Sequence, residues 1–369
     1  GGGQQVLLEL VLAAQSLPCD ITVLIPRGSC ADRLASMGVQ VEHIHECQLT
    51  SGEKTFSDVL QLIGNGLRVF FQKRKLLKNA DVIYVNGNRL MPVALLCMLL
   101  FAKKAVFHIH LNHGNLEKSV FSHIIKLCNT VAIIAPSAFI RTQLCQFSSK
   151  FNTPKLRLVE NGLDSRFSQV PFCDRFSEKP IRHIGIVGRI SPEKGQNVLP
   201  HLALQFPELT FHVLGDSAFS DRQYEERLRA AAPDNIVFHG WVENLPAKVD
   251  EIGLQICLAP SRCPESSPGR SFEAAPLVPL QMLALGCMVA VRSLGSLEYL
   301  ARELSLPTFE DDQDIPACLQ TILQMPAHQL SQKCQQGYAT VMAQYSHDAF
   351  QQRLRSLLAD VCGVQTATR

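Results

Sequence analysis

The sequence has few charged residues, no Cys-x-x-Cys pair and no apolar run long enough to cross a membrane. Charged residues make up 18% of the 369 residues and the net charge is +2, which argues against the basic excess of a nucleic-acid-binding surface. The longest apolar run, residues 93–102, is shorter than the roughly 20 residues of a membrane-spanning helix. The first residues also show no basic flank and no cleavage site of a signal peptide. We therefore expect a soluble, cytoplasmic protein that does not bind nucleic acid.

The thirteen cysteines are scattered along the chain, odd in number and without regular spacing. Several lie inside apolar runs, as Cys97 and Cys257 do. Single thiols of this kind are usual in reducing compartments, whereas disulfide frameworks and zinc sites need paired spacing. His43 and His45 lie near a strand end, but no third ligand completes a metal-binding pattern. We expect reduced thiols and no metal site.

The chain opens on three glycines, Gly1 to Gly3, followed by a helix that is amphipathic from Val6 to Ala14. A glycine loop that begins a helix can bring backbone amides close to an anion, normally where a strand delivers it. No strand precedes the glycines in this sequence. We expect that a first strand, with its entry about 10–15 residues, is missing from the N-terminal domain. The alternative is a cloning remnant or a flexible start.

Short apolar runs alternate with helical segments along the whole chain, a pattern typical of parallel sheets covered on both faces. Strands are expected at residues 21–26, 39–44, 82–85, 105–110, 131–135, 156–159, 184–187, 210–214, 236–238, 254–259 and 288–291. We predict an α/β protein with two Rossmann-like, doubly wound domains facing across a cleft. The domains are residues 1–165 and 181–345, with a polar linker at 166–180. A C-terminal helix and tail, residues 346–369, could pack back on the first domain.

The segment from Val187 to Gly195 places two cations directly after a buried strand. Arg189 offers a fixed fork of donors and Lys194 a mobile point charge, a combination that suits a diphosphate. In open α/β sheets ligands bind at the carboxyl ends of the strands. The alternative is an ordinary strand-to-helix turn with two solvated cations.

A second informative segment, residues 271–291, contains a loop, a helix and the start of a strand. Glu273 lies in the loop, and the helix start near Ala274 to Leu277 would offer free amides to a phosphate. Gln281 is eight residues after Glu273, so both side chains can face the same side. One could contact a sugar and the other a ribose.

These segments resemble the family 4 retaining glycosyltransferases of GT-B fold. The resemblance runs in order over nearly the whole chain, and its motifs are Gly2-Gly3, His110, Ile134-Ala135-Pro136-Ser137, Asn161-Gly162-Leu163-Asp164, Gly188-Arg189 with Lys194-Gly195, Leu214-Gly215-Asp216, Gly240-Trp241-Val242, Glu273, and Ala284-x-Gly286 leading into Val289-Ala290. Each motif is weak alone, but their common order is specific. The resemblance implies a retaining glycosyltransferase that uses a nucleotide-sugar donor and needs no metal or other cofactor.

The resemblance also implies roles for particular residues. Arg189 and Lys194 would hold the diphosphate and stabilise the charge that develops on it, Glu273 would contact the donor sugar, and His110 would lie near that sugar. The remaining donor-binding residues would be Gly2, Gly3, Gly188, Ala274, Ala275, Leu277 and Gln281. The acceptor hydroxyl would attack from the face of the leaving group, so that the leaving phosphate serves as base. No residue is therefore assigned as general base.

Two departures and one ambiguity qualify these assignments. Gln281 stands where the family usually has a second Glu, and an amide cannot accept two ribose hydroxyls as a carboxylate can. The loop ahead of Glu273, residues 262–270, is long. Its Glu265 also lies eight residues before Glu273, but Gly286 and the following strand favour the register that pairs Glu273 with Gln281. His108 and His110 share a strand face; His108 is expected in the core and His110 in the site, with His113 as the alternative.

Cations follow the helix at residues 58–72, at Lys73-Arg74-Lys75 and Lys78. They could contact anionic lipid at the inner face of a membrane, or they could form a solvated helix end. We predict transfer of a sugar to a glycan, a lipid-linked acceptor or a small molecule. The alternatives are another GT-B enzyme, such as a nucleotide-sugar epimerase or an inverting transferase, and a non-catalytic GT-B-like scaffold.

Overall fold

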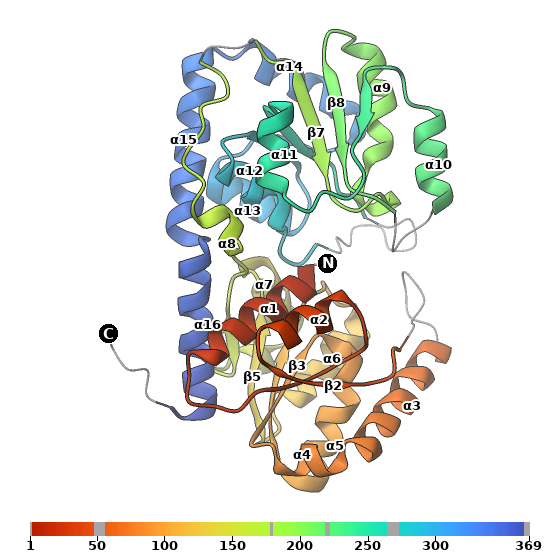
Figure 1. Ribbon diagram of the computed structural model, residues 1–369, viewed down its shortest axis with the longest axis vertical. Coiled ribbons are helices and arrows are strands. Elements are labelled where there is room, and N and C mark those ends of the chain that lie inside the picture. The colour runs from red at the N-terminus through yellow and green to blue at the C-terminus, as the bar shows by residue number, and fades with distance from the viewer. Residues whose placement is uncertain (1, 48–55, 178–179, 218–221, 264–272, 365–369) are drawn as a thin grey trace. The chain divides into compact units, whose positions relative to one another are not determined.

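The computed structural model describes residues 2–47, 56–177, 180–217, 222–263 and 273–364. The chain forms two compact units, unit 1 from residues 1–161 and 348–369 and unit 2 from residues 162–347. Glu265, the alternative partner of Glu273, lies outside the described residues. Figure 1 labels many of the elements of both units.

Unit 1 contains two parallel sheets among its described residues. A two-stranded sheet pairs β1 (Thr22–Ile25) with β2 (Gln40–His43). A four-stranded sheet has the order β3-β4-β5-β6, with strands β3 (Val82–Asn86), β4 (Lys104–His108), β5 (Thr130–Ala135) and β6 (Leu156–Leu158). Its strands follow chain order, so the four-stranded sheet has no point at which the order reverses.

Helices cover the sheets of unit 1. They are α1 (Gly2–Gln15), α2 (Ser29–Ser36), α3 (Phe56–Gln72), α4 (Arg74–Asn79), α5 (Met91–Phe101), α6 (Asn115–Ile124), α7 (Ala138–Phe147) and α16 (His347–Cys362), with short 3-10 turns η1 (Asn88–Leu90) and η2 (Ser149–Phe151). Helix α1 buries both of its apolar faces. Leu8 packs in a cluster with Val23 of β1, whereas Leu10 packs with Val106 of β4 and Phe350 of α16.

The C-terminal helix α16, blue in Figure 1, packs in unit 1. Its apolar side chains Phe350, Leu354 and Leu358 are buried in the same cluster as Ile134 of β5. Gln351 links α16 to α1. Its Nε2 donates to the main-chain oxygen of Glu9 at 3.0 Å and to the Glu9 carboxylate at 2.6 Å. A buried amide that satisfies a buried carboxylate favours this placement of the helix.

Unit 2 contains one six-stranded parallel sheet of order β12-β11-β10-β7-β8-β9. The strands are β7 (His183–Val187), β8 (Thr210–Leu214), β9 (Ile236–Phe238), β10 (Ile256–Ala259), β11 (Met288–Arg292) and β12 (Thr308–Phe309). Strands β10 and β11 are buried along their whole length and are apolar except for Arg292, as expected for a sheet covered on both faces. The strand order reverses between β7 and β10, and in such sheets the reversal point is where ligands bind.

Helices lie on both faces of the unit 2 sheet. They are α8 (Ser165–Ser168), α9 (Leu199–Gln205), α10 (Arg222–Ala230), α11 (Leu245–Ile252), α12 (Leu277–Ala284), α13 (Ser296–Leu304), α14 (Ile315–Gln324) and α15 (Ala327–Gln344), with 3-10 turns η3 (Pro192–Lys194), η4 (Gln196–Val198) and η5 (Asp312–Asp314). Residues 166–177 and 180, expected as a linker, belong to unit 2. Phe167 and Phe176 are buried in its two apolar clusters, so these residues form part of the domain.

All thirteen cysteines lie in the described residues, and each is a free thiol. Within the same residues, no helix has both the length and the apolar character needed to span a membrane. None of their His, Cys, Asp and Glu side chains gather in groups of three or more suited to a metal ion.

Candidate functional site

The strand-order reversal of unit 2 lies beside the loop that follows β7. Gly188 comes directly after β7, and its N–H donates to the main-chain oxygen of Leu214 at 2.9 Å. Ile190 N–H donates to the main-chain oxygen of Asp216 at 2.7 Å, and this bond joins the loop to the one after β8. The loop after β10 approaches from the other side, since the main-chain N–H of Arg262 donates to the main-chain oxygen of Glu193 at 2.9 Å. Three loops therefore meet at the carboxyl edge of the sheet.

Two residues hold the loop after β7 in shape. Gln196 is fully buried, and its Nε2 donates to the main-chain oxygen of Arg189 at 2.8 Å while its Oε1 accepts from Ser191 N–H at 3.3 Å. Gly215 has φ +148°, and a Cβ there would lie 2.0 Å from the Gly188 oxygen. Only glycine allows the two loops to approach this closely.

The loop presents Arg189 and Lys194, each bonded to a carboxylate. The Arg189 guanidinium pairs with Glu193 four residues along the chain, and the Arg189 side chain is exposed. The Lys194 ammonium pairs with Glu273 across 79 residues of sequence, and both side chains are partly buried. The two cations thus stand at one loop, and an anion could exchange with the carboxylates that now hold them.

Glu273 is positioned by Ser261 and Ser296 in addition to Lys194. Ser261, just after β10, donates its hydroxyl to Oε1 at 3.3 Å, and Ser296 at the start of α13 donates to the Glu273 main-chain oxygen at 2.7 Å. Burial opposes ionisation of the carboxyl. Lys194, Ser261 and Arg189 outweigh that effect and hold its pKa below the ordinary value. Glu273 is therefore a carboxylate that can accept hydrogen bonds.

The helix that follows, α12, begins at Leu277 after the N-cap residue Pro276, which offers no side-chain cap. The N–H groups of the first turn have no acceptor inside a helix, and Pro279 contributes no N–H. Ala274 is buried and Ala275 is partly exposed. Gln281 lies one turn further along α12, on a partly buried position.

In unit 1 the candidate residues lie at the carboxyl ends of β3 and β4. His110 follows β4, which ends at His108 rather than at residue 110 as expected. Its Nε2 lies 2.6 Å from Oδ1 of Asn86, the last residue of β3, and Asn86 Nδ2 donates to the Gly3 oxygen at 2.9 Å. A Cβ on Gly3 would lie 3.7 Å from the His110 ring. Gly3, Asn86 and His110 therefore form one cluster, with Gly2 next to it in α1.

This cluster determines the tautomer of His110. The Gly3 oxygen can only accept, so the Asn86 amide must direct its oxygen toward His110, and that oxygen also only accepts. His110 Nε2 therefore carries the hydrogen, and Nδ1 of the neutral ring carries none. Burial, with a smaller effect of His113, lowers the pKa of His110 to about 4. At neutral pH the ring is uncharged and offers Nδ1 as an acceptor.

The neighbouring histidines differ from His110 in their surroundings. His108 is buried, its Nδ1 lies 2.9 Å from the Tyr84 hydroxyl, and burial followed by His110 lowers its pKa well below the ordinary value. His113 is also buried, with its ring nitrogens 3.1 and 3.3 Å from Nδ2 of Asn88. His110 is thus the histidine linked through Asn86 to the glycine start of α1.

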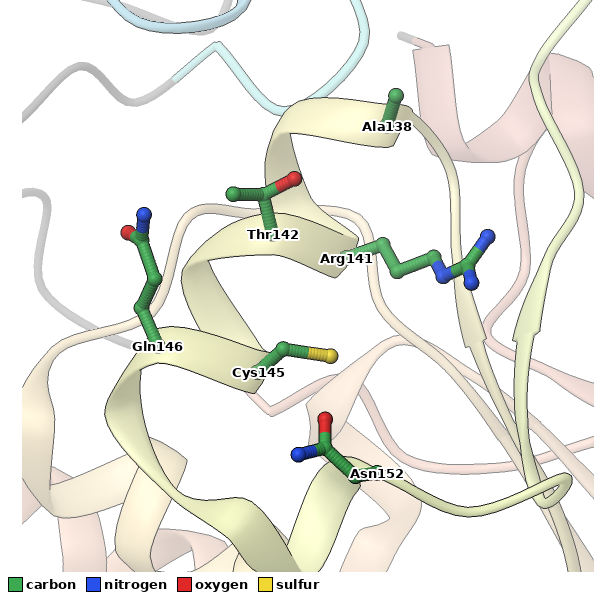
Figure 2. Close-up of a pocket in the computed structure, with 6 residues that line it drawn as sticks. All are labelled: Ala138, Arg141, Thr142, Cys145, Gln146 and Asn152. Atoms are coloured by element: carbon green, nitrogen blue, oxygen red, sulfur yellow. The ribbon is translucent and has the colours of Figure 1, made fainter.

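A separate open pocket of about 450 Å³ lies along α7. Figure 2 shows the side chains that line it, Ala138, Arg141, Thr142, Cys145, Gln146 and Asn152. Except for Ala138 and Cys145 they are polar, and Arg141 is the one charged member of the lining. Helix α7 starts directly after β5, where Ser137 caps it by accepting from Ile140 N–H at 3.3 Å. No sequence motif included the lining residues, because five of them lie on α7 without a distinctive spacing and Asn152 follows η2.

Sequence reasoning therefore selected residues that the structure gathers into two clusters. Arg189, Lys194 and Glu273 come together in unit 2, and Gly3 and His110 come together in unit 1. It missed the residues that hold them, which are Asn86, Gln196, Ser261 and Ser296. An available signal was position, since Asn86 ends β3, Ser261 follows β10 and Gln196 follows Gly195.

Comparison with known families agrees with this arrangement. Residues 1–167 match the model described as Glycosyltransferase Family 4, and residues 181–325 match Glycosyl transferases group 1. The chain belongs to the glycosyltransferases of GT-B fold. The two matched segments together include every candidate residue named above.

Solved structures show the same fold at low sequence identity. HepE from Anabaena, in complex with UDP and glucose, superposes with a TM-score of 0.74 at 18% identity, over 97% of this chain and 96% of that one. A glycosyltransferase from Rickettsia africae gives 0.73 at 14% identity, over 98% and 96%. Sucrose-phosphate synthase from Thermosynechococcus elongatus gives 0.70 at 15% identity, over 94% and 100%. No curated protein matches the chain significantly.

Proposed function

We propose that this glycosyltransferase transfers a sugar from a nucleoside diphosphate sugar to an acceptor hydroxyl with retention of configuration and without a metal ion. The observation that carries the proposal is the pair Arg189 and Lys194 on the loop after β7, at the strand-order reversal of unit 2. Two cations can neutralise a diphosphate in the place of a divalent ion.

In the proposed reaction the diphosphate takes over the hydrogen bonds that Arg189 and Lys194 make to Glu193 and Glu273. The bond from the anomeric carbon to the diphosphate oxygen breaks, and its electrons stay on that oxygen, where the two cations stabilise them. The acceptor oxygen bonds to the same face of the sugar, and its proton passes to the departing phosphate. Glu273, released from Lys194, accepts a hydrogen bond from a hydroxyl of the sugar.

The remaining assignments follow from the same proposal. Gly188, Ala274, Ala275, Leu277 and Gln281 would line the donor site in unit 2. In unit 1 Gly2 and Gly3 would contact the donor, and His110 Nδ1 would accept from a sugar hydroxyl.

Unit 1 would also bind the acceptor, which can be a glycan, a lipid-linked sugar or a small molecule. The polar pocket along α7 supports a hydroxyl-rich acceptor. The thirteen free thiols support a reducing, cytoplasmic location.

UDP-glucose is the first donor to test, because HepE has been solved with UDP-glucose. Calorimetry with UDP, GDP and ADP should show binding of one nucleotide, and hydrolysis of the matching sugar donor followed by NMR should release the sugar in its original anomeric form. Arg189→Ala should weaken nucleotide binding by about tenfold or more, because hydrogen bonds to charged groups contribute roughly 1.5–3 kcal/mol. EDTA should not change the rate.

Arg302→Ala is the matched control. Arg302 also pairs with a glutamate four residues away, Glu298, and its side chain is exposed on α13, so its loss should leave nucleotide binding unchanged. Inverted product would favour an inverting transferase, and a changed sugar without transfer would favour an epimerase. Absence of binding by every nucleotide tested would instead support a non-catalytic scaffold, in which Gln281 replaces the second Glu usual in the family.

A further inference from the structure

One face of helix α3 in unit 1 exposes large apolar side chains instead of burying them. Leu60, Ile63, Leu67 and Phe71 recur three or four residues apart, so they lie along one side of the helix. All four are exposed, Leu60 at 54% and Phe71 at 67%. Val69, on the opposite side of the same helix, is buried, and Phe70 is buried beside the exposed row. Helix α3 therefore has one apolar face in the core and a second at the surface.

The end of helix α5 extends this surface. Leu99 and Leu100, in its last turn, are 75% and 62% exposed. The ring of Phe101 stacks on Phe70 of α3 at 5.3 Å between centroids, so the two helix ends lie side by side. Figure 1 shows α3, α4 and α5 grouped at one end of unit 1. The exposed leucines of α5 thus lie at the helix end that packs beside α3.

The charges around this surface are mostly positive; the buried Asp58 and the exposed Asp81 flank residues 59–79. Residues 59–79 contain Arg68, Lys73, Arg74, Lys75 and Lys78 and no Asp or Glu. Lys73 pairs with Glu42 at 2.7 Å. Arg74, Lys75 and Lys78 on α4 are exposed and form no ion pair with any residue that the structure describes. Lys103 and Lys104 follow α5.

The exposed apolar side chains and the neighbouring cations together indicate which partner this surface can bind. A second copy of the chain would place the same cations against one another, and like charges oppose such a contact. An anionic lipid bilayer offers an apolar interior and a negative surface at once. A helix with exposed Leu and Phe on one face and Lys and Arg beside it is typical of helices that lie in the membrane interface. With 17 residues, α3 would cover about 25 Å of that interface.

We propose that the exposed face of α3, the end of α5 and the cations of α4 form a docking surface for an anionic bilayer. We call it the α3 surface, with members Leu60, Ile63, Leu67, Phe71, Arg74, Lys75, Lys78, Leu99 and Leu100. Helix α3 lies in the plane of the interface, and the cations contact lipid phosphates. The binding needs neither donor nor acceptor, so it stands or falls separately from the proposed reaction.

Vesicle sedimentation tests the proposal with the full chain. The protein should bind vesicles of phosphatidylcholine with one third phosphatidylglycerol, bind pure phosphatidylcholine weakly, and dissociate as salt rises. Arg74→Ala with Lys75→Ala and Lys78→Ala should lower the partition constant by about a hundredfold, since each cation near an anionic surface contributes roughly a factor of five. Phe71→Ser with Leu100→Ser should lower it by about tenfold or more through lost apolar burial.

Matched controls remove the same groups elsewhere. Leu204→Ser changes an exposed leucine of unit 2, and Arg33→Ala changes an exposed cation of α2 in unit 1; both should bind vesicles as the unchanged protein does. Trp241 is the single tryptophan, so Trp241→Phe with Phe71→Trp places one reporter on α3. Its emission should shift to the blue with anionic vesicles, and brominated lipid should quench it.

The proposal is overturned if the protein does not bind anionic vesicles at low salt, or if the controls lose as much binding as the α3 variants. It is also overturned if Phe71→Ser with Leu100→Ser abolishes self-association in sedimentation velocity without affecting vesicles. That result would assign the face to a second copy of the chain. Unchanged nucleotide binding in all variants would show that each is folded.

Discussion

The two units place their candidate residues at the same kind of position but give them opposite electrostatic character. In unit 2 the strand order reverses, and the edge carries two cations bonded to two carboxylates. In the four-stranded sheet of unit 1 the order never reverses, and the edge carries an uncharged histidine held by an amide. The pKa of His110 is about 4 and that of Glu273 is lowered, so at neutral pH one is neutral and the other ionised.

This difference suggests a division of labour. Charged groups that are already paired can exchange partners with an anionic ligand at small desolvation cost. A neutral imidazole with a fixed tautomer distinguishes hydroxyl orientations but adds little affinity for a phosphate. We expect unit 2 to supply affinity for the donor and unit 1 to supply orientation of the sugar.

The largest expected effect comes from removing a cation of unit 2. Lys194→Ala should lower kcat by about 10²–10³-fold, as loss of a group that stabilises developing charge does, and should weaken nucleotide binding. His110→Ala should leave nucleotide affinity unchanged and lower kcat alone. Calorimetry and steady-state kinetics on both variants check the contrast. Equal loss of nucleotide affinity in the two would contradict the division of labour.

A double variant sharpens this test. Lys194→Ala leaves the Glu273 carboxylate without its ion pair, which is costly for a partly buried charge. Lys194→Ala with Glu273→Gln should therefore be more stable than Lys194→Ala alone, although no more active. Additive losses of stability would show that the two side chains are not coupled.

A second prediction concerns the close approach of backbones in unit 2. Gly215→Ala should destabilise the protein by about 2–4 kcal/mol, because the added Cβ meets the Gly188 oxygen and the backbone has positive φ. Gly240→Ala is the control, since Gly240 has φ +65° but open space around it, and should cost about 1 kcal/mol. Chemical denaturation followed by Trp241 fluorescence reports on unit 2. Similar losses of stability in the two variants would mean that the close approach to the Gly188 oxygen does not add to the cost of the substitution.

Sequence reasoning found the alternation of strands and helices, the Arg189 and Lys194 loop and the family, because these depend on local patterns. It did not find that Asn86 connects His110 to Gly3, since 83 residues separate the two bonded partners. It suggested the first domain for α16 but could not decide it, because an apolar stripe does not specify the surface that buries it. Residues 166–180 look polar in composition, yet Phe167 and Phe176 anchor them in unit 2.

A third prediction uses pH to compare the units, each of which holds a histidine with a pKa of about 4. Burial lowers the pKa of His110 in unit 1 and of His212 in unit 2, with other histidines adding to the effect. The unfolded chain takes up these protons as pH falls through about 6.5, whereas the folded chain does not until about pH 4. The free energy of unfolding should therefore fall between pH 6.5 and pH 4 and be insensitive to these groups above pH 7.

Urea denaturation at pH 7 and pH 5 checks this prediction. With about 1.4 kcal/mol per pKa unit, each histidine should cost about 2 kcal/mol at pH 5. His212→Asn should reduce the acid loss seen by Trp241 fluorescence, and His110→Asn should reduce it only in circular dichroism of the whole chain. An acid loss that neither substitution reduces would assign the effect to other groups.

The smallest expected effect comes from the residue that positions His110. Asn86→Ala removes the acceptor of the Nε2 hydrogen, so His110 can adopt the other tautomer, and kcat should fall by about tenfold with nucleotide affinity unchanged. Asn86→Asp keeps the acceptor but adds a negative charge, which raises the pKa of His110. The pH profile of kcat should then show an acidic limb at higher pH than in the unchanged protein, because a protonated ring no longer offers Nδ1. If Asn86 served only in packing, the pH profile of kcat would not change. A shift of the acidic limb would therefore show that Asn86 positions His110.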